Sequence, residues 1–159
     1  NTVIIMTSNA GARNIVEPKR MGFTGMETAE QNYEYMKKNV MEEVKHIFKP
    51  EFLNRIDDMI VFHALTKEDV LQIVKLMTDS VAKRIQENLQ IHVTFTKKTL
   101  EKLAEAGYDK AYGARPLRRT IQSQIEDAFA EEYLKGEFWA GQKVSVGVKT
   151  NGFSFRVVK

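Results

Sequence analysis

The chain has 159 residues, of which 43% are hydrophobic and 28% charged, a balance typical of a globular protein with one domain or two small ones. It has no cysteine, which excludes disulfide bonds and thiolate metal sites, and its three histidines are scattered. The net charge of +3 is too small to indicate nucleic-acid binding, and no apolar run is long enough to span a membrane.

An apolar, β-branched run from Val3 to Met6 opens the chain. Such a run is typical of a strand covered on both faces in a parallel sheet, and it needs neighbouring strands on both sides. Few candidate neighbours follow, so we expect the chain to be the C-terminal part of a longer protein. Asn9 lies at the carboxyl end of this predicted strand, where open α/β sheets bind ligands, although asparagine is also common in turns.

Residues 13–31 contain glycines, a proline and mixed charges without a sustained period, which predicts an irregular loop. Within this loop lie Met21, Gly22 and Phe23. A large apolar pair in a polar loop either folds back onto its own protein or anchors a partner. Folding back is the commoner outcome, and the residues alone leave both interpretations open.

Apolar residues at three- and four-residue spacing predict an amphipathic helix over residues 31–48. Arg55 follows, between apolar neighbours that should pack and so anchor its backbone. A guanidinium on an anchored turn can contact a phosphate in trans, or it can form an ion pair with Asp57 or Asp58. Residues 59–62 then predict a second short buried strand.

From about residue 65 the pattern predicts a compact module of three helices and a three-stranded sheet. Thr66 is the predicted N-cap of a helix of about six turns, and Thr96 is the N-cap of a shorter one. Alternating apolar residues predict a strand over 91–95, and a turn at Asn151-Gly152 predicts a C-terminal β-hairpin. The predicted fold class is therefore mixed α/β (α+β).

The third helix of this module begins at Pro116, which places Arg115, Arg118 and Arg119 at or within its first turn. The N-terminus of a helix is already positive, so each cation there costs roughly 0.3–1 kcal/mol. Compensating negative charge is expected from one of two sources. A bound anion such as a phosphate is one, and surface carboxylates such as that of Asp109 are the other.

Three motifs occur in a fixed order: NTVIIMTSNAGA at 1–12, KPEFLNRID at 49–57 and GYDKAYGARPLRR at 107–119. Together they closely resemble the C-terminal part of the last ATPase module of the Clp class of AAA+ protein unfoldases. The resemblance covers the whole chain. It implies that residues 1–64 are the C-terminal strands and helix of a large nucleotide-binding subdomain, and that residues 65–159 are the small C-terminal domain.

The resemblance also implies roles for three residues. Asn9 matches the first sensor, which helps to position the attacking water near the γ-phosphate. Arg55 matches the arginine finger, which reaches the nucleotide of the neighbouring subunit. Arg115 matches the second sensor, which contacts the nucleotide of its own subunit.

A further implied feature is the segment Met21-Gly22-Phe23, within the loop at about 13–31. Peptidase-coupled members of the class carry an apolar-Gly-apolar loop here that docks on the ClpP peptidase, and disaggregases lack it. The chain therefore looks most like the ClpC group, with Met21 where isoleucine or valine is usual.

For the full-length protein the resemblance implies ATP or ADP with Mg²⁺, a homo-hexamer, protein substrates and adaptors, and a cytoplasmic location. The phosphate loop and the paired acids that hold Mg²⁺ are absent from this sequence, so we expect the chain alone to be inactive. A hinge is expected near residues 62–65. Two alternatives stay open: a disaggregase that is not coupled to a peptidase, and a stand-alone assembly or binding module.

Overall fold

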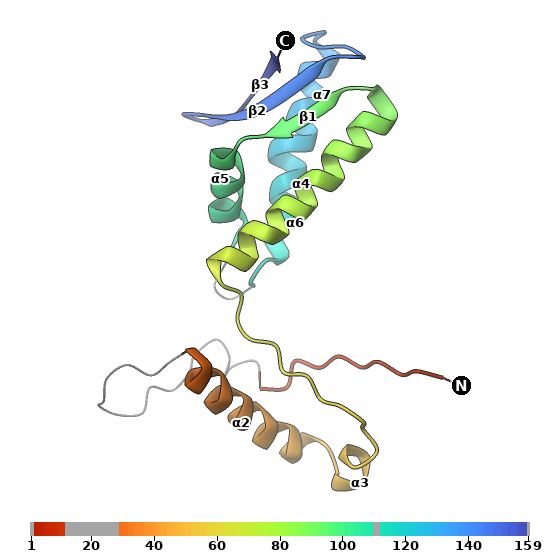
Figure 1. Ribbon diagram of the computed structural model, residues 1–159, viewed down its shortest axis with the longest axis vertical. Helices are drawn as coiled ribbons and strands as arrows, with labels where there is room; N and C mark the ends of the chain where they lie inside the picture. Colours follow the sequence, from red (N-terminus) through yellow and green to blue (C-terminus); the bar gives the residue numbers. More distant parts are fainter. Residues whose placement is uncertain (1, 12–28, 110–111, 159) are drawn as a thin grey trace. The chain divides into compact units, whose positions relative to one another are not determined.

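The chain folds as two compact units, Asn1–Ala64 and Leu65–Lys159. This division comes from a computed structural model, which describes residues 2–11, 29–109 and 112–158 (Figure 1).

The first unit is built on helix α2, Ala29–Ile47, followed by the short helix α3, Pro50–Leu53 (Figure 1). The predicted amphipathic helix is confirmed, and Met36 and Val40, four residues apart, form its buried face. Gly11 packs against this face with a φ of 73°. A Cβ atom on Gly11 would lie 3.0 Å from both Cγ atoms of Val40, so the close approach requires glycine.

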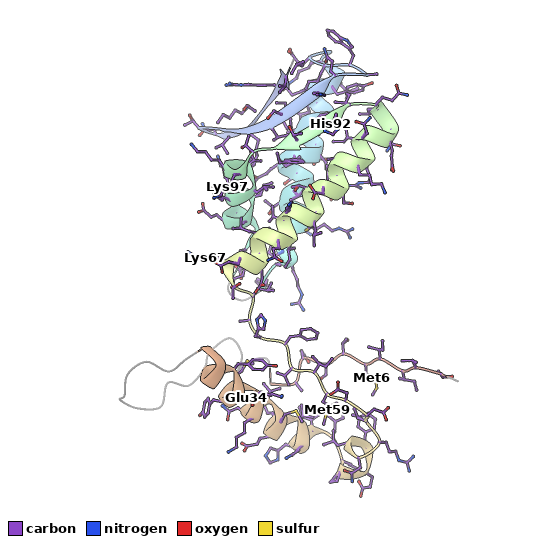
Figure 2. The ribbon with its side chains drawn as sticks, viewed as in Figure 1. Met6, Glu34, Met59, Lys67, His92 and Lys97 are labelled. Atoms are coloured by element: carbon purple, nitrogen blue, oxygen red, sulfur yellow. The ribbon has the colours of Figure 1, made fainter. Side chains whose placement is uncertain are left out.

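The two strands predicted in the first unit do not form, and these predictions are wrong. Residues 2–9 and 58–64 are extended without strand pairing, and Figure 2 shows Met6 and Met59 on these segments. Val3 is 87% exposed and Phe62 is 78% exposed. The physical reason is that a doubly covered strand needs hydrogen-bonding neighbours, and the described residues of this unit offer none.

The second unit contains three helices and a three-stranded sheet, so the predicted mixed fold class is confirmed. The helices are α4 (Lys67–Leu89), α5 (Lys97–Gly107) and a continuous stretch made of α6 (Arg115–Ile121), the π-helical segment η1 (Gln122–Glu126) and α7 (Asp127–Leu134). The predicted cap at Thr66 is present as a full capping box with Asp69. The Thr96 side chain likewise accepts a hydrogen bond from the N–H of Thr99.

The sheet has the order β1-β2-β3, with β1 spanning His92–Phe95, β2 Lys143–Lys149 and β3 Gly152–Val158. Strand β1 runs parallel to β2, with Val93 opposite Val144. Strands β2 and β3 form the predicted antiparallel hairpin. The helices cover one face of this sheet (Figure 1).

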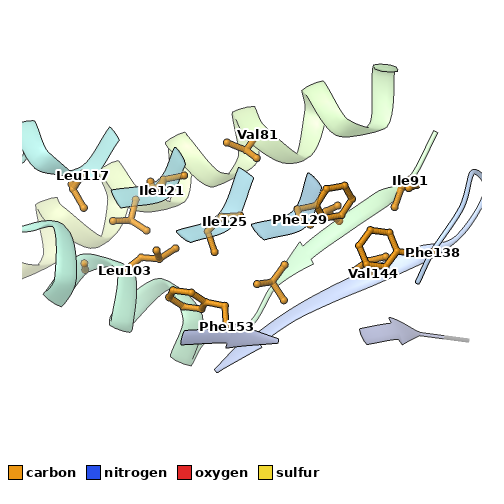
Figure 3. Close-up of a cluster of buried hydrophobic side chains, with 14 of the residues drawn as sticks. Val81, Ile91, Leu103, Leu117, Ile121, Ile125, Phe129, Phe138, Val144 and Phe153 are labelled. Carbon is orange, nitrogen blue, oxygen red and sulfur yellow. The ribbon is translucent and has the colours of Figure 1, made fainter. Parts of the chain in front are cut away.

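The core of the second unit lies between the helices and that face of the sheet (Figure 3). Leu103, Leu117 and Ile125 are each 0% exposed. At the far end of the core, Phe129 packs against Phe138, with ring centroids 4.8 Å apart. This core holds together α5 and α6, and the candidate phosphate-binding arginine follows the loop between them.

Candidate functional site

The loop between α5 and α6 sets the position of Arg115. Asp109 and Gly113 exchange two backbone hydrogen bonds, of 3.1 and 2.6 Å, and the Asp109 carboxylate accepts a hydrogen bond from the N–H of Tyr112 at 2.9 Å. Gly113 has a φ of 63°, which favours glycine. The closed loop gives the backbone of Arg115 a fixed starting point.

A second contact, between the end of α5 and the start of α6, also fixes this region. Gly107, the last residue of α5, packs directly against Leu117 in the first turn of α6. A Cβ atom on Gly107 would lie 2.4 Å from Cδ2 of Leu117 and 3.0 Å from its Cα. Since Leu117 is fully buried, it cannot move aside without disturbing the core. The first turn of α6 is therefore packed against the core, which fixes the backbone from which the arginines project.

Arg115, Arg118 and Arg119 are all exposed. Within residues 29–109 and 112–158, no ion pair joins any of the three guanidinium groups to a carboxylate. The N-cap residue, Ala114, also lacks a side-chain acceptor for the free N–H groups of the helix. Among the described residues, no ion pair offsets the positive charge at the start of α6, an arrangement that suits an anionic ligand.

Arg118 differs from its neighbours because it lines a groove between α4 and the third helix. The groove has a volume of about 520 Å³, and its floor includes Met77 and Ile121. One rim carries an ion pair between Arg84 Nη2 and Glu126 Oε1, at 2.8 Å. Sequence reasoning missed this groove, because the π-helical segment η1 on its edge has no signature in the sequence.

Arg55 lies just beyond α3, in the first unit. Its N–H donates to the carbonyl oxygen of Phe52 at 3.1 Å, and Phe52 stacks on Phe48 with ring centroids 5.4 Å apart. The Arg55 side chain is exposed. In the part of the chain that the structure describes, it forms no ion pair with Asp57 or Asp58, so the internal salt bridge considered above is not present.

Asn9 lies on the extended segment that leads to Gly11, and its side chain is exposed. The local turn is held by a hydrogen bond of 3.1 Å from the N–H of Ala10 to the Ser8 hydroxyl. Asn9 and Arg55 belong to the first unit and Arg115 to the second. Met21, Gly22 and Phe23 lie outside the described residues.

The described ranges contain neither a candidate metal site nor a candidate membrane-spanning helix. No group of three or more His, Cys, Asp or Glu side chains is placed to hold a metal ion there. No helix there is long and apolar enough to cross a membrane.

The two units match models of two protein families. Residues 1–59 match the AAA domain of the Cdc48 subfamily. Residues 65–146, more than half of the chain, match the C-terminal, D2-small domain of ClpB protein. The chain therefore belongs to the family of that domain, and so to the Clp class of AAA+ proteins.

Relatives within the class carry two different names. The chain is 49% identical, over 96% of its length, to "Chaperone protein ClpB" of Oceanobacillus iheyensis. It is 44% identical, over its whole length, to "ATP-dependent Clp protease ATP-binding subunit ClpC" of Staphylococcus aureus. The chain spans about a fifth of these relatives, 18% and 19% of their lengths. The predicted class is confirmed, and the choice between the two groups remains a prediction.

Proposed function

We propose that the chain serves as the nucleotide-sensing and peptidase-docking part of a Clp-class, ATP-dependent protein unfoldase. The observation that carries this proposal is the state of Arg115. Its base is fixed by a closed loop, it stands at a helix end that is already positive, and no described carboxylate pairs with it. An ATP phosphate would supply the missing negative charge and accept the guanidinium hydrogen bonds.

Two further residues would complete the chain's share of the ATP site. Asn9 would help to position the attacking water, as the first sensor. Arg55 would act in trans, on the nucleotide of the neighbouring subunit in a homo-hexamer. Its exposed guanidinium suits this task, because an arginine aimed at the charge that develops on a transferring phosphoryl group stabilises the transition state. Mg²⁺ would be held by residues outside this chain.

Arg55 and Arg115 can be tested in a full-length protein that contains this chain. We expect Arg55→Ala and Arg115→Ala each to lower the ATPase kcat by about 100-fold or more, the usual cost of removing one donor to a developing charge. Arg119→Ala is the matched control, since it removes the same charge from the same helix and should keep near-normal activity. Wild-type ATPase rates in both test variants would refute the assignments. The chain alone should show no ATPase activity.

Met21 and Phe23 are proposed as apolar anchors for the ClpP peptidase, with Gly22 between them. Deleting Met21 to Phe23 from the full-length protein should abolish ClpP-dependent degradation of a substrate and leave the ATPase rate unchanged. The control is Met21→Ile, which keeps the apolar-Gly-apolar pattern of the segment and should retain degradation. Persisting degradation after the deletion would mean that the loop does not dock the peptidase. Protein substrates, adaptors and a cytoplasmic location belong to the same proposal.

A disaggregase without a peptidase partner is the second candidate function. The 49% identity to a protein named as the chaperone ClpB favours it. The same full-length protein would then reactivate aggregated substrate without ClpP, and deletion of Met21 to Phe23 would change nothing. Measuring degradation and reactivation side by side therefore separates the two candidates.

A further inference from the structure

The start of α6 differs from the starts of the other two helices of the second unit. Helices α4 and α5 each follow a threonine whose side chain caps the helix. The N-cap residue of α6 is Ala114, and in the part of the chain that the structure describes no side chain caps this helix. The N–H of Arg115 bonds instead to the carbonyl oxygen of Tyr112, at 3.4 Å. The backbone of Tyr112 therefore helps to set where Arg115 begins.

Asp109 holds this part of the backbone through both its side chain and its main chain. Its carboxylate accepts a hydrogen bond from the N–H of Tyr112 at 2.9 Å. Its carbonyl oxygen accepts one from the N–H of Gly113 at 2.6 Å, and its own N–H donates to the Gly113 carbonyl oxygen at 3.1 Å. The peptide groups on either side of Tyr112 are thus both bonded to Asp109.

Asp109 is itself fixed to the end of α5. The residue before it, Tyr108, is the C-cap of that helix, and its N–H donates to the carbonyl oxygen of Ala104 at 3.1 Å. Ala104 is buried in the core of the second unit. A series of hydrogen bonds therefore leads from the end of α5 through Asp109 and Tyr112 to Arg115.

The carboxylate of Asp109 could serve Arg115 in two chemically different ways. As a counterion it would offset the positive charge of the arginines, which requires a negative charge close to a guanidinium group. As a hydrogen-bond acceptor it would hold the loop, which requires an oxygen but no charge. The described residues show the bond to the Tyr112 N–H and no ion pair between Asp109 and an arginine of α6.

We propose that Asp109 is a positioning residue for Arg115, and that its carboxylate acts as the hydrogen-bond acceptor that the N-cap residue Ala114 does not provide. The inference rests on the function proposed above, in which Arg115 contacts the nucleotide. A small displacement of such a group is costly, because binding and catalysis both require it to meet the phosphate oxygens in one geometry.

The first test measures the loop itself, in this chain and without nucleotide. Asp109→Ala removes the acceptor, whereas Asp109→Asn keeps an acceptor oxygen and removes the charge. Amide hydrogen exchange at Tyr112 and Gly113, followed by NMR, should become about 10-fold faster in Asp109→Ala and stay within about 3-fold of the wild type in Asp109→Asn. Asp79→Ala, at an exposed carboxylate on α4, is the matched control and should change neither rate.

The second test measures the consequence for Arg115, in a full-length protein that contains this chain. Asp109→Ala should lower the ATPase kcat/KM by about 10-fold or more, the scale of loss expected when a group that contacts the nucleotide is misplaced. Asp109→Asn should restore kcat/KM to within about 3-fold of the wild type. If Asp109→Asn is as impaired as Asp109→Ala, the charge and not the hydrogen bond is required, and the proposal is wrong.

A double-mutant cycle shows whether Asp109 acts through Arg115. Adding Asp109→Ala to Arg115→Ala should cause no further loss of kcat/KM, because the arginine that it positions is already gone. A further loss as large as that in the wild-type background would overturn the proposal. Thermal unfolding of each variant reports whether the second unit keeps its fold, and Asp109→Asn provides the comparison if Asp109→Ala does not.

The two tests also separate this inference from the function on which it rests. Wild-type kinetics in Arg115→Ala would refute the nucleotide contact and, with it, the role of Asp109 in catalysis. The exchange rates at Tyr112 would still show whether the carboxylate holds the loop. Unchanged exchange in Asp109→Ala would overturn the inference and leave the nucleotide contact of Arg115 standing.

Discussion

The two units of this chain bury very different amounts of apolar surface, although both contain amphipathic helices. In the second unit, fifteen buried residues from the helices and the sheet form one core. In the described part of the first unit, Met36 and Val40 are buried, whereas Val3, Ile5 and Phe62 are each more than 75% exposed. Because exposed aliphatic surface is unfavourable in water, the first unit has apolar segments that its own described residues do not cover.

The comparison shows that an apolar run in the sequence becomes part of a core only when other segments of the protein cover it. The second unit closes its sheet with helices from the same stretch of chain, so every strand finds partners within about 70 residues. The extended segments of the first unit would need strands on either side to be buried. Three pairs of substitutions follow: the first compares the two units directly, and the other two test contacts that hold the second unit together.

The largest expected effect comes from a truncation in the core of the second unit. Leu103→Ala should lower the free energy of unfolding of that unit by about 2–5 kcal/mol, because Leu103 is 0% exposed and truncation of its side chain leaves a cavity in the core. Its counterpart in the first unit is Ile4→Ala, at a side chain that is 77% exposed, which should change stability by less than about 0.5 kcal/mol. Urea unfolding of the isolated chain measures both. Equal effects would remove the contrast between the units.

A middle-sized effect is expected where α5 meets α6. Gly107→Ala should destabilise the second unit by about 1–3 kcal/mol, because the new Cβ would collide with Leu117. Gly113→Ala is the control: its Cβ would meet nothing within 4 Å, so only its φ of 63° opposes alanine, at about 1 kcal/mol. Thermal unfolding should rank Gly107→Ala as the more damaging change. The reverse order would show that the close contact between Gly107 and Leu117 does not determine how α6 packs against α5.

The smallest effect concerns the end of the β-hairpin. Lys102 Nζ donates to the carbonyl oxygens of Lys149 and Gly152, both at 3.2 Å, and lies 5.5 Å from the ring centroid of Phe153. Lys102→Met should cost about 1 kcal/mol and speed amide exchange at the hairpin turn, because it removes the donor and keeps most of the apolar stem. Lys98→Met, at an exposed position on the same helix, should have no effect. Unchanged exchange at the turn in Lys102→Met would show that the turn holds without this side chain.

Local features of the fold could be predicted from the sequence because their partners lie within a few residues. Thr66 and Thr96 cap their helices as predicted, since the residues that they bind, Asp69 and Thr99, are only three positions away. The hairpin turn at Asn151-Gly152 is equally local. The strand predicted at Val3 to Met6 failed because strand pairing depends on distant residues, which an apolar run does not identify.

In the candidate site, too, the sequence predicted the local features and the tertiary structure decided the contacts. The sequence placed three arginines at the start of a helix and left two explanations open, a bound anion or surface carboxylates. The structure describes no ion pair for Arg115, and it distinguishes Arg118 from Arg115 because Arg118 lines a groove between α4 and the third helix. In the first unit, the Tyr33 hydroxyl donates a hydrogen bond of 2.8 Å to the carbonyl oxygen of Val61, and the sequence gives no signal for it because the partners are 28 residues apart.

The sequence by itself determined the class of the protein, the helices with their caps, and the motifs that contain Asn9, Arg55 and Arg115. Periodicity, capping and turn chemistry act over three to five residues, so the order of residues is enough to specify them. Only the tertiary structure decided which apolar segments are buried and which arginines form no ion pair with the carboxylates that the structure describes. Those outcomes depend on contacts between residues far apart in the chain, and the free energy of such contacts comes from burial and pairing after the chain has folded.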